Sequence, residues 1–242
     1  NPTTGVKFQM ESRQGCWSYA TCSFLESELL RTGKGTFNLS EDFFLYHAYI
    51  QKGLNYVLRH GNASFKNGGL AHDVLKIVKE IGIVPSPYFK IDHIAYTKGP
   101  TVVLKSYLNT ILEEDYLEED WMRHYLALLN SYFSERSEQF QFESNTYTPK
   151  SFADYIEIDA DDYVSITSFT HHPFYEDFVL EIRDNYASGF YFNLPLNDFT
   201  QVVDTCLMKG YTLVWDGCIE GNGYSKIEIT FIWFNRLSNH IK

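Results

Sequence analysis

The sequence predicts an α+β fold in which helices come first and strands follow. Up to about residue 132, apolar side chains recur at the three- and four-residue spacing of amphipathic helices. Beyond about residue 160, short runs of β-branched and aromatic residues have the pattern of strands. This segregation favours a mainly helical lobe, residues 1–155, beside a β-rich lobe, residues 156–242, with a cleft between them. With 44% hydrophobic side chains, the 242-residue chain can bury a sizeable core.

The helical part divides into five predicted helices. The first begins at Cys16 and ends at Arg31, since apolar side chains keep helical spacing up to the stop signals Gly33 and Gly35. A second starts after Ser40, a hydroxyl cap followed by two acidic residues. Apolar stripes predict three more helices, over 70–81, 102–112 and 121–132.

The remaining third is predicted to contain strands and a single helix. The polar stretch 134–149 is expected to be a surface connection. A helix is expected over 197–208, with Gly210 as its stop signal. Strands are expected over 163–170, 189–194, 211–215 and 227–233. The sequence diverges or is truncated after about residue 221, so we expect an incomplete β lobe.

Composition excludes several classes of function. Lys and Arg total 20 and Asp and Glu total 31, and the net charge of −11 repels nucleic acid. No apolar run approaches the roughly 18 residues of a membrane span. Four cysteines are too few for a disulfide scaffold in a chain of this length. The sequence starts at Asn1 without an apolar signal segment, so a processed amino terminus and the localisation stay open.

The sharpest local signal is Cys16, which starts a predicted helix between Gly15 and Trp17. A free thiol has a pKa of roughly 8.5, and the amide groups at a helix start favour the nucleophilic thiolate. The same amides can stabilise an oxyanion on an attacked carbonyl. The alternative is a small buried hydrophobe, the commoner fate of a free cysteine.

Three motifs occur in the order found in one enzyme superfamily: Cys16-Trp17-Ser18-Tyr19, Leu39-Ser40-Glu41 and Asn67-Gly68-Gly69. Together they resemble the papain-like cysteine peptidases, whose nucleophile is followed by Trp or Tyr. The segment looks closest to the bleomycin hydrolase and aminopeptidase C branch, because Arg13 and Lys66 stand where secreted members have cysteines. The resemblance covers roughly residues 6–220.

The resemblance implies roles for four residues. Cys16 would be the nucleophile and Gln9 the side-chain donor of the oxyanion hole, one position earlier than the family places its glutamine. Gln14 is an alternative donor. Gln9 could instead be a surface residue without a catalytic role. Gly68 and Gly69 would let substrate main chain run close alongside the enzyme. No cofactor is implied.

The general base is left unassigned by the sequence. His171 and His172 have about the papain spacing from Cys16, and Asn193 follows, but Pro173 stands where the family has a strand. We expect these histidines to be loop or cleft-lining residues. His240, in an Asn-His dipeptide like the one that carries the family's base, is a further candidate.

No metal site is expected. Adjacent histidines can indicate one, but successive side chains on an extended segment point apart. No carboxylate or cysteine partner stands at ligand spacing in the sequence.

The predicted function is that of a cysteine peptidase, most like an aminopeptidase, that acts on peptides by acyl transfer. The alternative is a peptide-binding or assembly module that keeps the scaffold without the base. A carbohydrate-binding surface is a third interpretation, suggested by 18 Tyr and 4 Trp, which are mostly explained as core. Neither nucleic acid nor membrane is expected as a partner, and the resemblance implies a homo-oligomer.

Overall fold

The first helix, α1 (Cys16–Arg31), begins at the predicted cysteine in a computed structural model that describes residues 15–91, 99–134 and 138–217. Gly15 enters the helix with φ of 80°, in the left-handed region that favours glycine. A Cβ on Gly15 would also lie 2.6 Å from the Leu45 side chain. The turn that positions Cys16 therefore requires a glycine.

The other predicted helices are also present. Ser40 caps α2 (Glu41–Leu58), because its Oγ accepts a hydrogen bond of 3.1 Å from the Phe43 amide. Three more helices follow within a few residues of their predicted limits: α3 (Ala71–Glu80), α5 (Pro100–Glu113) and α6 (Trp121–Asn130). A short 3₁₀ turn, η1 (Ser86–Tyr88), follows α3.

The later part of the described chain holds two small sheets. β1 (Phe140–Phe142) and β2 (Asn145–Tyr147) form an antiparallel hairpin. β3 (Ile166–Thr167), β4 (Asp177–Val179) and β5 (Phe190–Asn193) form a sheet of order β3-β5-β4, in which β3 is parallel and β4 antiparallel to β5. The remaining elements are α7 (Pro149–Tyr155), η2 (Ala160–Asp162) and α8 (Leu196–Met208). The predicted α+β class is confirmed.

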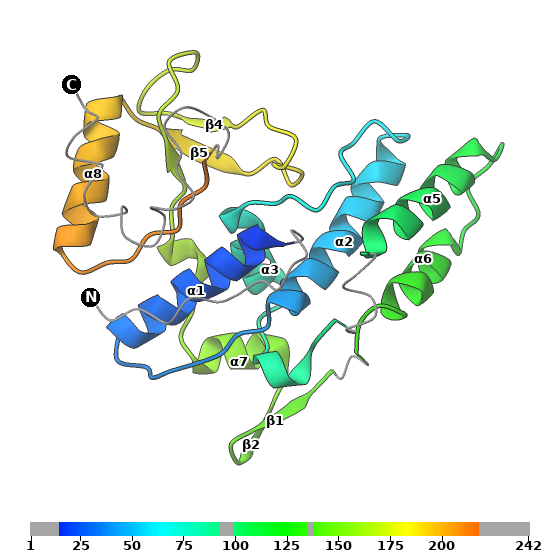
Figure 1. The fold of residues 1–242 in the computed structure, drawn as a ribbon, viewed down its shortest axis with the longest axis horizontal. Coiled ribbons are helices and arrows are strands. Elements are labelled where there is room, and N and C mark those ends of the chain that lie inside the picture. Colours follow the sequence, from blue (N-terminus) through cyan, green and yellow to red (C-terminus); the bar gives the residue numbers. More distant parts are fainter. Residues whose placement is uncertain (1–14, 92–98, 135–137, 218–242) are drawn as a thin grey trace, which may run out of the picture.

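The arrangement of these elements places α1, α2 and α3 at the centre (Figure 1). α1 contacts both α2 and α3, and α2 also contacts α5 and α6. Figure 1 shows the sheet of β4 and β5 with α8 on one side of this centre and α5 with α6 on the other. The start of α1 therefore lies among elements that are far apart in the sequence.

The described part of the predicted polar surface connection, 134–149, is mostly exposed as expected, but it forms the hairpin β1–β2. Its aromatic residues pack on Phe152 of α7, which is fully buried. The ring centroids of Phe140, Phe142 and Tyr147 lie 5.4, 5.0 and 5.6 Å from that of Phe152. The hairpin thus packs these three rings against Phe152, while the polar residues of the hairpin face solvent.

The predicted strand over 211–215 does not form, and the described segment is irregular. The Thr212 amide and hydroxyl both donate to Glu28 Oε1, at 2.9 and 2.6 Å. These bonds hold the segment on α1 instead of in a sheet. The strand expected over 227–233 and the change near residue 221 lie outside the described residues. Within the described ranges, no helix combines the length and apolarity needed to cross a bilayer.

Candidate functional site

Cys16 lies at the first position of α1, as predicted, and its side chain is accessible to solvent. The backbone N–H groups of Trp17 and of Cys16 itself favour the thiolate form of the sulfur. These are helix-start amides without an intrahelical acceptor. The geometry supplies both an accessible nucleophile and backbone donors beside it.

The electrostatic surroundings of Cys16 differ from the sequence prediction. Desolvation by the surrounding protein raises the pKa of the thiol, and the carboxylates of Asp184 and Asp216 raise it further. The two backbone N–H groups lower the pKa of Cys16 but do not offset these effects. The described residues therefore give no net stabilisation of a thiolate, and nucleophilic attack would need a general base.

Trp17 joins Cys16 to the Asn67-Gly68-Gly69 loop. Its indole Nε1–H donates to the Asn67 carbonyl oxygen at 3.0 Å. A Cβ on Gly69 would lie 2.6 Å from the Trp17 ring, which is itself buried. The structure thus brings together the thiol and the loop that the sequence predicts for substrate main chain, although they are about 50 residues apart.

Lys52 of α2 also holds this loop in place. Its ammonium donates to the Lys66 carbonyl oxygen at 2.7 Å and to the Gly68 carbonyl oxygen. The Nζ atom lies 4.8 Å from the centre of the Tyr186 ring, and the residue is only 4% exposed. Burial lowers the pKa of Lys52 to about 8, although the nearby carboxylates of Asp73 and Asp184 favour its charged form.

The side chain of Asn67 is also held. Its Oδ1 accepts hydrogen bonds from Tyr49 Oη at 3.2 Å and from Thr101 Oγ1. Together with Trp17 and Lys52, these contacts engage the carbonyl groups of residues 66, 67 and 68. Within the described part of the chain, the N–H and C=O of Gly69 make no hydrogen bond. Gly69 is itself buried against the Trp17 ring, and Gly68 is the half-buried glycine of the pair.

Asp184 covers the other side of the loop. An ideal Cβ on Gly68 would lie 2.2 to 2.4 Å from the carboxylate atoms of Asp184. The charges of Asp184 and Asp216 both raise the pKa of the Cys16 thiol. Burial, followed by the charge of Asp184, raises the pKa of Asp216. The surroundings of the thiol are thus acidic and complementary to a cation.

Lys52, Asp184 and Asp216 were not predicted from the sequence as part of this site. Lys52 carries a signal, because it follows Ala48 and Tyr49 on the buried face of an amphipathic helix, where a lysine is unusual. Asp184 and Asp216 carry no such signal, since they stand in irregular segments far from the motifs.

Two of the histidines considered for the unassigned base lie in the described part of the chain, in a turn, as the expectation of loop residues implies. His171 and His172 lie in a turn and both face Glu181. Asn193 is fully buried in β5, where its side chain holds that turn. None of the hydrogen bonds between described residues joins a histidine to Cys16. Further sequence-predicted residues lie outside the described ranges: Gln9, Gln14, Asn239 and His240.

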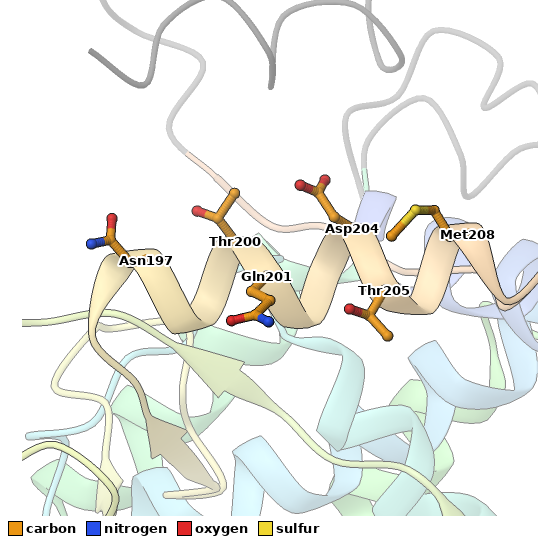
Figure 2. Close-up of a pocket in the computed structure, with 6 residues that line it drawn as sticks. All are labelled: Asn197, Thr200, Gln201, Asp204, Thr205 and Met208. Carbon is orange, nitrogen blue, oxygen red and sulfur yellow. The ribbon is translucent and has the colours of Figure 1, made fainter.

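A shallow groove of about 370 Å³ runs along α8 (Figure 2). Its lining consists of Asn197, Thr200, Gln201, Asp204, Thr205 and Met208. All six side chains come from one helix, and they include no nucleophile next to a general base. This groove does not include the residues around Cys16 and supports no catalytic assignment.

Comparisons with known proteins show likeness at the level of the fold. No family model matches the chain, and no curated protein matches it. The structure is similar to the crystal structure of PepW from Lactobacillus rhamnosis HN001 (DR20), with a TM-score of 0.66 and 17% identity over 87% of this chain. This chain spans 59% of the length of that one. The chain therefore shares its fold with a solved structure that carries a peptidase name.

Proposed function

We propose that this chain is a papain-like cysteine peptidase of the bleomycin hydrolase and aminopeptidase C branch. The observation that carries the proposal is the contact of Trp17, next to Cys16, with the Asn67-Gly68-Gly69 loop. Likeness to a fold with a peptidase name supports the class of reaction. An accessible thiol beside a main-chain edge is the arrangement that acyl transfer from a peptide requires.

In the proposed reaction, the peptide lies along Gly68 and Gly69 and presents a carbonyl carbon to Cys16. The loop backbone, half-buried at Gly68, binds the peptide main chain. A base takes the thiol proton as the sulfur attacks, because the raised pKa of Cys16 leaves the thiol protonated near neutral pH. The C–S bond forms, and the oxyanion accepts hydrogen bonds from the helix-start amides and the Gln9 amide.

The tetrahedral intermediate then collapses. The C–N bond breaks, the base returns its proton to the leaving amine, and a thioester on Cys16 remains. Water attacks the thioester through the same base, which releases the carboxylic acid and regenerates the thiol. His171 and His172 face Glu181, which makes His240 the candidate base among the three histidines considered from the sequence.

Aminopeptidase specificity fits the charges near the thiol. A substrate with a free amino terminus carries an ammonium close to the bond that is cut. The carboxylates of Asp184 and Asp216 lie where they act on the Cys16 thiol, so they can also attract that ammonium. An internal segment of a protein has no such charge at the corresponding position.

The test is hydrolysis of fluorogenic aminoacyl amides by the wild-type chain and by Cys16→Ser. We expect the variant to lose at least roughly 1,000-fold in kcat, because removal of a nucleophile abolishes the covalent route. Cys206→Ser is the matched control and should keep wild-type activity. Turnover that survives Cys16→Ser would contradict the assignment of the nucleophile.

A second candidate function is a peptide-binding module without turnover. It is favoured by the raised pKa of Cys16, since an unactivated thiol attacks amides poorly. Trp17 contacts the Gly69 edge, so its fluorescence should report peptide binding. Saturable binding without hydrolysis by the wild-type chain would support this function over the peptidase.

A further inference from the structure

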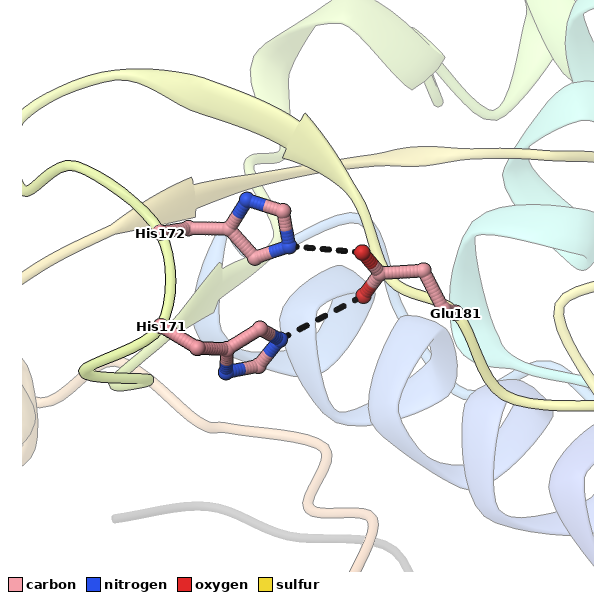
Figure 3. A group of neighbouring side chains, drawn as sticks. All are labelled: His171, His172 and Glu181. Carbon is pink, nitrogen blue, oxygen red and sulfur yellow. Dashed lines mark hydrogen bonds and ion pairs between the residues drawn. The ribbon is translucent and has the colours of Figure 1, made fainter.

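Two imidazoles and a carboxylate converge on the surface beside β4 (Figure 3). His172 Nε2 lies 2.7 Å from Glu181 Oε1, and His171 Nε2 lies 3.5 Å from Glu181 Oε2. The ligand atoms of all three side chains lie within 4.8 Å of one another. We propose that His171, His172 and Glu181 bind a divalent transition-metal ion, with Zn²⁺ as the best chemical match. This site shares no residue with the site around Cys16.

The turn that carries the histidines explains how adjacent side chains converge. The sequence-based expectation that they point apart assumed an extended segment, and this expectation is wrong, because residues 171–172 lie in a turn. The buried Asn193 holds it: its Nδ2 donates to the carbonyl oxygens of Phe169, His172 and Pro173 at 2.8, 3.1 and 3.0 Å. Its Oδ1 accepts from the Phe169 amide at 2.8 Å. The backbone under both imidazoles is therefore fixed.

The rings are oriented by an aromatic neighbour. The His172 ring stacks on Phe178 with centroids 4.0 Å apart and an interplanar angle of 23°. Phe178 belongs to β4 and is buried, so it offers a rigid surface. The His171 ring lies 4.4 Å from the His172 ring and packs edge-on to Phe169. The two imidazoles are thus pre-organised toward Glu181 before any ion binds.

The donor set suits zinc. Two imidazole nitrogens and one carboxylate, with ligand bonds of about 2.0 to 2.2 Å and water in the fourth position, form a common open zinc site. A carboxylate only accepts, so Nε2 carries the proton in the contact with Glu181. The neutral tautomer with its proton on Nδ1 instead offers the Nε2 lone pair to the metal. The side chains of His171 and Glu181 are 56% and 59% exposed, so an ion and its water can reach them.

A second cluster offers a useful contrast. Glu118, Asp120 and His124 also lie close enough to hold an ion. However, Arg123 forms an ion pair with Asp120, and its guanidinium lies 3.3 Å from His124 Nε2. A fixed positive charge and a single imidazole disfavour a transition metal there. This cluster therefore supplies the matched negative control.

The experiment is a titration of the chelator-treated, desalted full chain with ZnCl₂ by isothermal calorimetry, repeated with Co²⁺ to record ligand-field absorption. We expect one site per chain and a tetrahedral Co²⁺ spectrum. His172→Ala and Glu181→Gln should each weaken binding by at least about tenfold. His124→Ala should bind like the wild type. No saturable binding, or equal binding by the wild type and His172→Ala, would overturn the proposal.

A second measurement uses only the wild-type chain, so its result does not depend on whether a variant folds. Diethylpyrocarbonate modifies accessible imidazoles, and mass spectrometry locates the modification. Zn²⁺ should slow the modification of His171 and His172 at least about tenfold, while exposed His60 and His124 should react as before. Unchanged rates at His171 and His172 would also overturn the proposal. Neither readout depends on peptidase activity.

Discussion

At the scale of single residues, Lys52 is the unusual feature of the site. Its buried ammonium donates hydrogen bonds to two carbonyl groups and thereby fixes the position of the loop. We expect Lys52→Met to raise KM for peptide substrates about tenfold with a smaller change in kcat, because the loop loses its anchor while Cys16 stays in place. The free energy of unfolding should fall by about 2 kcal/mol, because the carbonyl groups of Lys66 and Gly68 lose their buried donor. Steady-state kinetics and urea unfolding measure these effects.

Lys66→Met is the matched control for that prediction. Lys66 belongs to the same loop, but its side chain is exposed and only its carbonyl group accepts from Lys52. Its substitution should leave KM and stability near wild type. An equal rise in KM for both variants would contradict the positioning role of Lys52.

Asp73 makes stability depend on pH. It is fully buried, and burial raises its pKa from 3.8 to about 7. The folded chain therefore binds this proton more tightly than the unfolded chain, and the stabilisation is lost as pH rises from about 4 to 7. Asp73→Asn cannot ionise, so its stability relative to wild type should increase over this range, by at most about 4 kcal/mol. Urea unfolding of both proteins at pH 5 and pH 8 measures the difference, and a constant difference would contradict the raised pKa of Asp73.

At the scale of elements, the start of α1 and the loop before α3 form one unit through the Trp17 ring. Gly69→Ala puts a methyl group 2.6 Å from this buried ring, whose Nε1 is tied to Asn67. We expect a loss of about 2 kcal/mol in unfolding free energy and a marked rise in KM. Gly68→Ala is the control, because its methyl group meets the end of the exposed Asp184 side chain, which can move. Thermal unfolding that ranks Gly68→Ala as the more damaging change would contradict this packing.

The elements also show what the sequence can predict. Helices such as α1 and α3 were predictable because their apolar periodicity, glycine stops and caps are local signals. The β1–β2 hairpin was not, since its aromatic residues are explained only by their contact with Phe152. The position of Cys16 at a helix start was predictable from its motif, and the roles of Cys16, Gly68 and Gly69 stay predictions. Lys52, Asp184 and Glu181 depend on contacts between distant segments, which a single sequence does not reveal.

At the scale of the whole molecule, the net charge of −11 and the carboxylates near Cys16 act in the same direction. Both would attract the ammonium group of the proposed substrate, and salt screens charges over about 10 Å at 0.1 M. We expect kcat/KM for an aminoacyl amide to fall severalfold between roughly 0.01 M and 0.5 M salt. The N-acetylated amide, which lacks the ammonium, should be a poorer substrate with little salt dependence.

Asp184→Asn distinguishes the effect of the carboxylates near Cys16 from the effect of the net charge of the chain. The substitution keeps the size of the side chain over Gly68 and removes one of the charges that act on the thiol. KM for the free aminoacyl amide should rise about tenfold, because the ammonium loses a nearby partner. KM for the N-acetylated amide should stay the same, since its amino group carries no charge. An equal change in KM for both substrates would contradict a charge interaction between Asp184 and the substrate ammonium. It would show instead that Asp184 acts on the conformation of the loop.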